Sequence, residues 1–210
     1  MARQIGPACR NCRREGIKLF LKGVRCETAK CPMEKDYRNK PPGMHAWRRG
    51  KSSDFGVRLR EKQKVKRFYG VFEKQFRRLY EMAERGMENT GETLLRLLER
   101  RLDNAVFKAG FAPSRKTARQ AIAHGHIFVG GRRIDRPGYL VQPADKITVR
   151  SSEKSQKFIR TQMGDDNQRQ AQSWLQVDPN KMEAVVLTLP GREDVQIPVE
   201  EALIVEFCSR

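Results

Sequence analysis

Four of the five cysteines lie within the first 31 residues, in the stretch PACRNCRREGIKLFLKGVRCETAKCP. Cys9 and Cys12 form a C-x2-C pair, and Cys26 and Cys31 form a C-x4-C pair after an interval of thirteen residues. Each pair is tight enough to bind an ion from one side, and the interval is long enough for the chain to fold back. Two thiolate pairs with this spacing favour tetrahedral Zn²⁺.

The compartment decides between metal binding and disulfide formation, because disulfides persist only in oxidising surroundings. The opening residues MARQIGPACRNC contain no apolar run typical of a signal peptide, and no run of about 18 apolar residues suggests a membrane span. We therefore expect a cytoplasmic protein whose four thiolates close the coordination shell of a structural zinc ion. Ordinary reduced thiols and an iron–sulfur cluster are the alternatives. Cys208, in the apolar run IVEFC, is predicted to be a buried core thiol.

The charge of the chain is large and unevenly distributed. There are 43 Lys and Arg against 25 Asp and Glu, a net charge of +18. Residues 1–85 hold 24 of the cations and 9 of the anions, which leaves +15, whereas residues 165–210 hold 4 and 9, which leaves −5. Such a cationic segment predicts a polyanionic partner, either nucleic acid or an anionic membrane surface. The helix described next must bury its apolar stripe in a core, so we expect nucleic acid and no membrane.

The stretch FGVRLREKQKVKRFYGVFEKQFRRLYEMAERG has the periodicity of a helix. Eight positions form one apolar stripe: Val65, Phe68, Tyr69, Phe72, Phe76, Leu79, Tyr80 and Ala83. Another face carries a row of cations, Arg67, Lys74, Arg78 and Arg85. Such a row is either a solvated surface or a contact for a polyanion. Gly70 inside the pattern marks a bend or a junction between two helices.

Two further helices are predicted in the middle of the chain. NTGETLLRLLERRLDNAVFKAGF has an amphipathic pattern that begins with a cap at Asn89 and ends at Gly110. Ser114 is expected to cap a short helix that ends at Gly125. The start of this short helix offers free backbone N–H groups to phosphate and directs three cations outward: Arg115, Lys116 and Arg119.

Strand-like patterns occupy much of the remaining sequence. Ile127–Val129 and Arg132–Ile134 flank Gly130–Gly131, a two-residue hairpin turn, and Lys146–Arg150 predicts a further strand. WLQVDP and MEAVVLTLPGREDVQIPV alternate like strands, whereas residues 151–172 form a loop or a helix. VEEALIVEFCSR returns to a helix, and its glutamates favour docking on the basic helices of the first half.

The stretch LREKQKVKRFYGVFEKQFRR closely resembles the bacterial small ribosomal subunit protein four family. The resemblance continues through ARQIGPACRNCRREGIKLFLKGVRC, PPGMHAWRRGKSSDFG and NTGETLLRLLERRLDNAVFKAGFAPSRKTARQAIAHGHIFVGGRRID, and so covers nearly the whole chain. The last of these stretches is similar to the compact RNA-binding domain named after the family. The sequence departs from the usual family pattern at Trp47, at Gly130 and at Gly138 in RPGY.

The resemblance implies an α+β fold built from three parts. Residues 1–44 would form a zinc-binding segment and a basic arm. Residues 45–95 and 197–210 would form a helical domain that the C-terminal helix closes. Residues 96–196 would form the inserted RNA-binding domain, with a small antiparallel sheet and the C-terminal strands.

The resemblance also implies a structural constituent of the small ribosomal subunit that binds 16S rRNA at a junction in its 5′ domain early in assembly. Such a protein contributes to the messenger path and to translational accuracy, beside small-subunit protein five. We predict rRNA contacts for thirteen cations: Arg3, Arg13, Arg14, Lys62, Lys64, Arg67, Lys74, Arg78, Arg115, Lys116, Arg119, Arg132 and Arg133. Arg48, Arg49 and Lys51 align with the basic cluster that lines the messenger channel in this family.

Two other classes of function fit the sequence less well. No Ser/His/Asp set, phosphate-binding loop or paired-carboxylate motif stands out, and His124 and His126 flank a helix end, so we expect no enzyme. A free-standing assembly or stress factor could use the same RNA-binding domain. The extended connector, rich in Pro, Gly and charge, needs RNA on several sides to order it, which favours a permanent ribosomal component.

Overall fold

The computed structural model describes residues 5–44, 53–163 and 172–209, and the chain divides into two compact units. The first unit comprises Met1–Leu94 and Ile197–Arg210, and the second comprises Leu95–Gln196. The described residues form eight α-helices and one five-stranded antiparallel sheet, so the predicted α+β class is confirmed.

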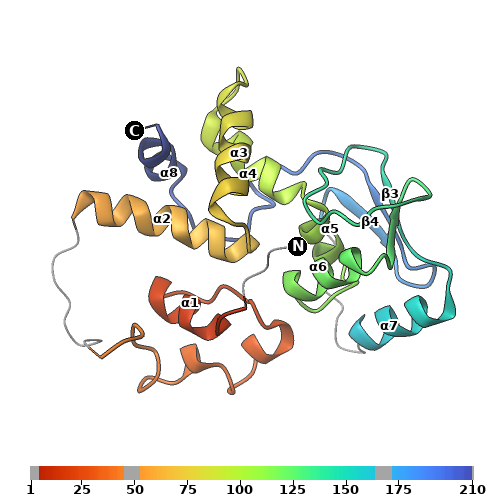
Figure 1. The fold of residues 1–210 in the computed structure, drawn as a ribbon, viewed down its shortest axis with the longest axis horizontal. Helices are drawn as coiled ribbons and strands as arrows, with labels where there is room; N and C mark the ends of the chain where they lie inside the picture. Colours follow the sequence, from red (N-terminus) through yellow and green to blue (C-terminus); the bar gives the residue numbers. More distant parts are fainter. Residues whose placement is uncertain (1–4, 45–52, 164–171, 210) are drawn as a thin grey trace. The chain divides into compact units, whose positions relative to one another are not determined.

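The first unit is helical (Figure 1). Its elements are α1 (Ala8–Glu15), the 3₁₀ turns η1 (Gly23–Cys26) and η2 (Pro32–Glu34), α2 (Asp54–Tyr69), α3 (Glu73–Glu84), the start of α4 (Thr90–Glu99) and α8 (Glu201–Cys208). The Ser53 side chain begins α2 by accepting a hydrogen bond from the Gly56 backbone N–H at 3.2 Å. Gly70, with φ of +65°, ends α2 and therefore marks a junction between two helices. The predicted apolar stripe is buried except at Phe72.

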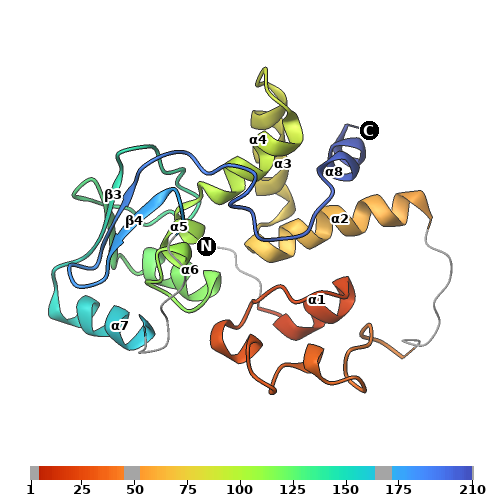
Figure 2. The same ribbon diagram turned by 180° about the vertical axis from the view of Figure 1, so that it is seen from behind.

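The C-terminal helix α8 packs along α2, as the sequence predicts. Both views place α2 between α1 and α8 (Figures 1 and 2). The Arg58 Nε atom on α2 donates a hydrogen bond to the Glu206 carboxylate on α8 at 2.7 Å, and the Phe55 and Phe207 rings lie 5.3 Å apart. Cys208 is half-buried rather than a core thiol, because it lies in the last turn of α8.

The second unit packs helices against the sheet. Its elements are the end of α4, α5 (Leu102–Lys108), α6 (Arg115–Ala123), β1 (Ile127–Val129), β2 (Arg132–Arg133), β3 (Lys146–Val149), α7 (Glu153–Met163), β4 (Leu175–Asp178) and β5 (Glu183–Val186). The strand order is β2-β1-β3-β5-β4. Phe111, Ile122, Ile147 and Trp174 are among the fully buried side chains of one core shared by helices and strands. The predicted hairpin forms, and α7 shows that residues 151–172 include a helix.

The predicted helix from Asn89 to Gly110 begins with the Asn89 cap but is not continuous, because the chain breaks it into α4 and α5. Arg101 is extended, with φ of −63° and ψ of 136°, and it forms an isolated antiparallel bridge with Leu140. The Leu102 backbone N–H donates to the Tyr139 carbonyl at 2.8 Å. A tertiary contact therefore replaces a turn of helix that the local pattern favours.

The predicted strand pattern after residue 181 is correct only for Glu183–Val186. Pro190 and Pro198 lack the backbone N–H that a central strand needs, and the Gly191 N–H donates to the Asp194 carboxylate at 2.8 Å. The rest of this segment is therefore irregular. Within the described ranges, no helix is both long enough and apolar enough to cross a bilayer.

Candidate nucleic-acid interface

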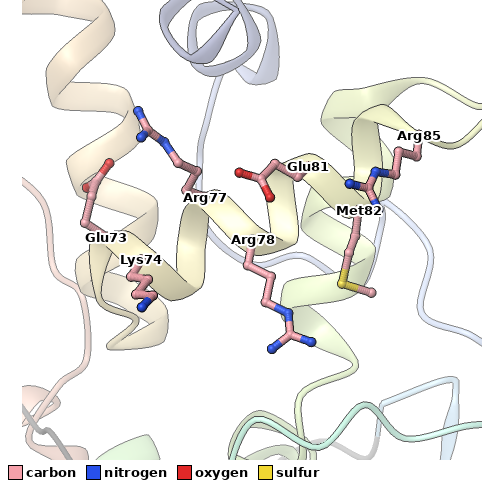
Figure 3. Close-up of a pocket in the computed structure, with 7 residues that line it drawn as sticks. All are labelled: Glu73, Lys74, Arg77, Arg78, Glu81, Met82 and Arg85. Atoms are coloured by element: carbon pink, nitrogen blue, oxygen red, sulfur yellow. The ribbon is translucent and has the colours of Figure 1, made fainter.

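Helix α3 presents a group of exposed cations in the first unit. Six of its residues and the C-cap residue Arg85 line an open groove of about 840 Å³ (Figure 3): Glu73, Lys74, Arg77, Arg78, Glu81, Met82 and Arg85. Lys74 and Arg78 extend to one side of the helix, whereas Arg77 lies on another side. Among the described residues, Lys74, Arg77, Arg78 and Arg85 form no salt bridge and are exposed.

The opposite face of α3 explains this exposure. Phe76, Leu79, Tyr80 and Ala83 are buried there, so the helix cannot rotate without exposing its apolar stripe. The amphipathic pattern therefore directs the cations into solvent. Arg77 is absent from the set of rRNA contacts predicted from the sequence, although the positions of Phe76 and Tyr80 in the stripe place it on the polar face.

The cations of α2 are used inside the protein. The Lys62 and Lys66 ammonium groups donate to the Glu73 carboxylate at 2.6 and 2.5 Å, and Lys62 also lies 4.5 Å from the centre of the Phe207 ring. Burial alone would raise the pKa of Glu73, but the hydrogen bonds from Lys62 and Lys66 lower it. Lys64 lies 2.5 Å from Glu61. Lys62 and Lys66 therefore link α2 to α3, whereas the Lys64 pair lies within α2.

Arg67 does not continue the cation row of α3, contrary to the sequence pattern. Its guanidinium donates to the Glu15 carboxylate of α1, whose side chain is 1% exposed, and Arg60 lies 3.6 Å from the same oxygen. Burial raises the pKa of Glu15, and the two arginines act in the opposite direction. This contact attaches the cysteine-containing segment to α2. The row is interrupted because Gly70 separates α2 from α3.

The start of α6 forms as predicted, but Arg115 does not point outward. The Ser114 side chain caps the helix by accepting from the Thr117 N–H at 3.2 Å. Arg115 is buried, donates from Nε to the Asn104 amide oxygen at 2.8 Å and lies over the Phe107 ring at 4.5 Å. An aromatic face and an amide acceptor inside the unit draw the guanidinium inward. Lys116 is exposed.

A buried carboxylate organises the neighbouring arginines. Arg101 donates two hydrogen bonds to Asp103, at 3.1 and 2.8 Å, and the Arg119 guanidinium donates to the same carboxylate at 2.9 Å. The side chains of Asp103 and Arg101 are 2% and 4% exposed, and that of Arg119 is 15% exposed. Arg119 is therefore partly committed to the interior of the unit.

The β1–β2 hairpin places two arginines in solvent. Gly130 and Gly131 have φ of +55° and +75°, which suits a two-residue turn with both central residues left-handed. Val129 pairs with Arg132 and Phe128 pairs with Arg133 across the hairpin. Arg132 and Arg133 are exposed, and among the described residues neither forms a salt bridge.

The cysteine segment has donor chemistry that suits zinc, but no three His, Cys, Asp or Glu side chains within the described ranges are arranged to hold a metal ion. Cys12, Cys26 and Cys31 are buried, and all four thiols are free of disulfides. The Lys22 backbone N–H donates to the Cys26 sulfur at 3.4 Å. Burial raises the pKa of Cys12, and the nearby Cys26, Cys9 and Cys31 raise it further. Cys9 and Cys12 lie on α1, Cys26 ends η1 and Cys31 directly precedes η2.

Several predicted site residues lie elsewhere. Arg13 donates from Nε to the Lys40 carbonyl at 2.7 Å, and Arg14 is exposed on α1. Four predicted contacts lie outside the described residues, as does Trp47: Arg3, Arg48, Arg49 and Lys51. Gly138 lies against the buried Arg101, since a β-carbon at this position would lie 3.2 Å from Arg101 Nη1.

Comparison with known proteins agrees with these features. The profile of the ribosomal protein S4/S9 N-terminal domain matches residues 3–99, and that of the S4 domain matches residues 100–147. Small ribosomal subunit protein uS4 of Thermoanaerobacter sp. (strain X514) is 50% identical over 210 residues, and that of Halothermothrix orenii is 51% identical over 210 residues. The uS4 protein of Thermus thermophilus is 50% identical over 211 residues, and all three alignments cover 100% of both chains. The chain belongs to the small ribosomal subunit protein uS4 family.

Proposed function

We propose that this protein is a structural constituent of the small ribosomal subunit that binds 16S rRNA directly and nucleates assembly of the 5′ domain. The observation that carries this proposal is the separation of faces on α3, where four exposed cations lie opposite a buried apolar stripe. Cations that neutralise phosphates release the counterions condensed on the nucleic acid, which supplies the sequence-independent part of the affinity. The exposed arginines of the β1–β2 hairpin supply a second set of contacts.

Nine of the thirteen predicted rRNA contacts fall into two groups by their exposure and their contacts within the protein. Lys74, Arg78, Arg132 and Arg133 are exposed and would contact phosphate directly. Five others form ion pairs or buried hydrogen bonds within their units: Lys62, Lys64, Arg67, Arg115 and Arg119. We propose that the cations of the second group mainly stabilise the elements on which the exposed cations of the first group lie.

Salt dependence of rRNA binding tests the assignment. Each phosphate neutralised contributes roughly 0.7–0.9 to the slope of log affinity against log salt concentration. The Lys74→Ala/Arg78→Ala variant is expected to lose roughly 1.4–1.8 of this slope on a 5′-domain fragment of 16S rRNA. The matched control is Lys154→Ala/Lys157→Ala, which removes the same charge from exposed positions of α7. Equal slopes for the two double variants would refute direct contact by α3.

Permanent residence in the ribosome distinguishes this proposal from a free-standing assembly or stress factor. A structural constituent is expected to sediment with small subunits through a high-salt wash, because many contacts along rRNA must break together. Complete release of the protein at the salt concentration that removes loosely bound factors would favour a free-standing factor.

We also propose that the protein lies beside small-subunit protein five.

We further propose that Cys9, Cys12, Cys26 and Cys31 bind one structural Zn²⁺ within the segment of residues 1–44. The spacing of the two pairs, the burial of three thiols and the hydrogen bond that the Lys22 backbone N–H donates to the Cys26 sulfur support this assignment. Zinc bound by four thiolates would cross-link α1 to the two 3₁₀ turns. Purified protein is expected to hold about one zinc per chain, and Cys9→Ser is expected to lose it whereas Cys208→Ser keeps it. Metal-free protein after reduction and zinc supplementation would refute the site.

We propose that Arg48, Arg49 and Lys51, which lie outside the described residues, contact the messenger RNA at its entry channel. Three cations within four residues, separated by Gly50, suit attraction to a moving single-stranded backbone without sequence preference. Changing all three to Ala is expected to slow translation of a hairpin-containing reporter more than that of an unstructured one, while subunit assembly stays near normal. Equal slowing of both reporters would refute this role.

A further inference from the structure

Arg133 lies across the end of helix α6 in the second unit. A β-carbon built on Gly125 would lie 2.6 Å from Arg133 Nε, 2.8 Å from Cζ and 2.9 Å from Nη2. Because these three distances are nearly equal, the plane of the guanidinium lies over Gly125, and no single atom of the group makes the contact alone. The arginine of β2 is thus held by a contact that only a residue without a side chain permits.

The backbone already gives Gly125 one structural role. Its N–H donates to the Ile122 carbonyl at 2.9 Å, and the His126 N–H donates to the Ala121 carbonyl at 3.0 Å. These bonds form a Schellman motif, in which the residue after the helix cap is left-handed, and Gly125 has φ of +75°. This motif accounts for the backbone conformation but not for the packing of Arg133 on the glycine.

The helix end also suits a cation. The last carbonyl groups of α6 give it a partial negative charge, which attracts a guanidinium placed over its final turn. Arg133 is nevertheless exposed. Pairing of Phe128 with Arg133 fixes the backbone from which the side chain starts. The β1–β2 register, the negative end of α6 and the space above Gly125 together hold the Arg133 side chain over the last turn of α6.

We propose that Gly125 is a positioning residue that leaves room for Arg133 to lie over the end of α6 and thereby orients it toward an rRNA phosphate. This inference rests on the proposed phosphate contact of Arg133. A β-carbon at residue 125 would force the guanidinium outward by roughly 1 Å, since carbon and nitrogen atoms pack at about 3.5–4.0 Å. The displaced arginine would keep its charge but lose its orientation.

A matched glycine separates this effect from backbone strain. Gly131 has the same φ of +75°, but a β-carbon there would meet no heavy atom within 4 Å. Gly125→Ala and Gly131→Ala therefore impose similar left-handed strain, and only the first displaces Arg133. Gly125→Asn is a second variant, because Asn tolerates the left-handed conformation better than Ala and still carries the β-carbon.

The experiment measures affinity and salt slope of the full chain on a 5′-domain fragment of 16S rRNA. Arg133→Ala is expected to weaken binding on the order of tenfold and to lower the slope by about 0.7–0.9. Gly125→Ala and Gly125→Asn are expected to approach the loss of affinity and the lower salt slope of Arg133→Ala. The double variant Gly125→Ala/Arg133→Ala is expected to bind no more weakly than Arg133→Ala alone. Gly131→Ala is expected to retain the slope.

The outcomes distinguish the inference from the function on which it rests. Wild-type binding by Arg133→Ala would refute the phosphate contact of Arg133, and with it the inference. A clear loss in Arg133→Ala with a normal slope in Gly125→Asn would refute the positioning role alone. Losses that add in the double variant would also refute it, because residues acting on one contact must be coupled.

Discussion

Asp103 is predicted to be the most sensitive charged position in the second unit. Its carboxylate accepts three hydrogen bonds, at 3.1, 2.8 and 2.9 Å, from the guanidinium groups of Arg101 and Arg119. Asp103→Asn keeps the shape and one acceptor oxygen but leaves the buried Arg101 without a counter-charge. Removal of one partner from a buried ion pair costs about 3–5 kcal/mol. The retained acceptor places our expectation at the lower end, about 3 kcal/mol.

Denaturation of the full chain measures this cost. Trp174 is fully buried in the second unit, and Trp47 is the other of the two tryptophans, so a Trp47→Phe background makes fluorescence a report on the second unit. A loss of about 3 kcal/mol in a unit of this size lowers the melting temperature by roughly 12–24 °C. Asp178→Asn is the control, since its pair with Lys181 spans 3.7 Å and is largely exposed, worth at most about 1 kcal/mol. Comparable losses in the two variants would refute the reasoning.

Two further predictions concern pH. Burial, with smaller contributions from His124 and Arg150, lowers the pKa of His126 in the folded protein. As pH drops below 6.5, His126 is therefore protonated in the unfolded chain before it is protonated in the folded one, and the stability of the second unit falls. His126→Gln should flatten this decline in melts between pH 7 and 5, whereas His45→Gln should not; parallel curves for His126→Gln and the unaltered chain would contradict it. Lys62 and Lys66 lower the pKa of Glu73, so their ion pairs stabilise the first unit above pH 4.5, and this stabilisation is lost as pH falls further and the carboxylate is protonated. Glu73→Gln should therefore cost no more than about 1 kcal/mol of unfolding free energy at pH 7, and less in acid. Glu81→Gln is its control on the same helix, and an equal or growing cost of Glu73→Gln in acid would count against the ion pairs.

Local patterns were sufficient for the elements that local chemistry defines. The apolar stripe of α3, the Ser114 cap and the two-glycine hairpin could be read from sequence because each depends on residues close along the chain. The docking of α8 on α2 followed from complementary charge, and the pair between Arg58 and Glu206 agrees with it.

Contacts between distant residues could not be read in this way. The break before α5 depends on the pairing of Arg101 with Leu140, which no helical periodicity reveals. The inward turn of Arg115 depends on Phe107 and Asn104, whose positions follow only from the packing of α5 against α6. Arg67 fits a row of cations by spacing, yet Glu15, 52 residues earlier, turns it inward.

These cases share one physical cause, which bears on how the RNA surface is built. An arginine becomes structural when an acid, an amide or an aromatic ring folds onto it, and it remains available to phosphate when none does. The acids that neutralise cations are placed selectively: Glu15, Glu73 and Asp103 each contact two basic residues in their own unit. The exposed polar side of α3 keeps Lys74, Arg77, Arg78 and Arg85 outside these pairs. The same net charge could thus be distributed over many surfaces, and the positions of a few acids, two of them buried, determine which cations stay unpaired on the surface.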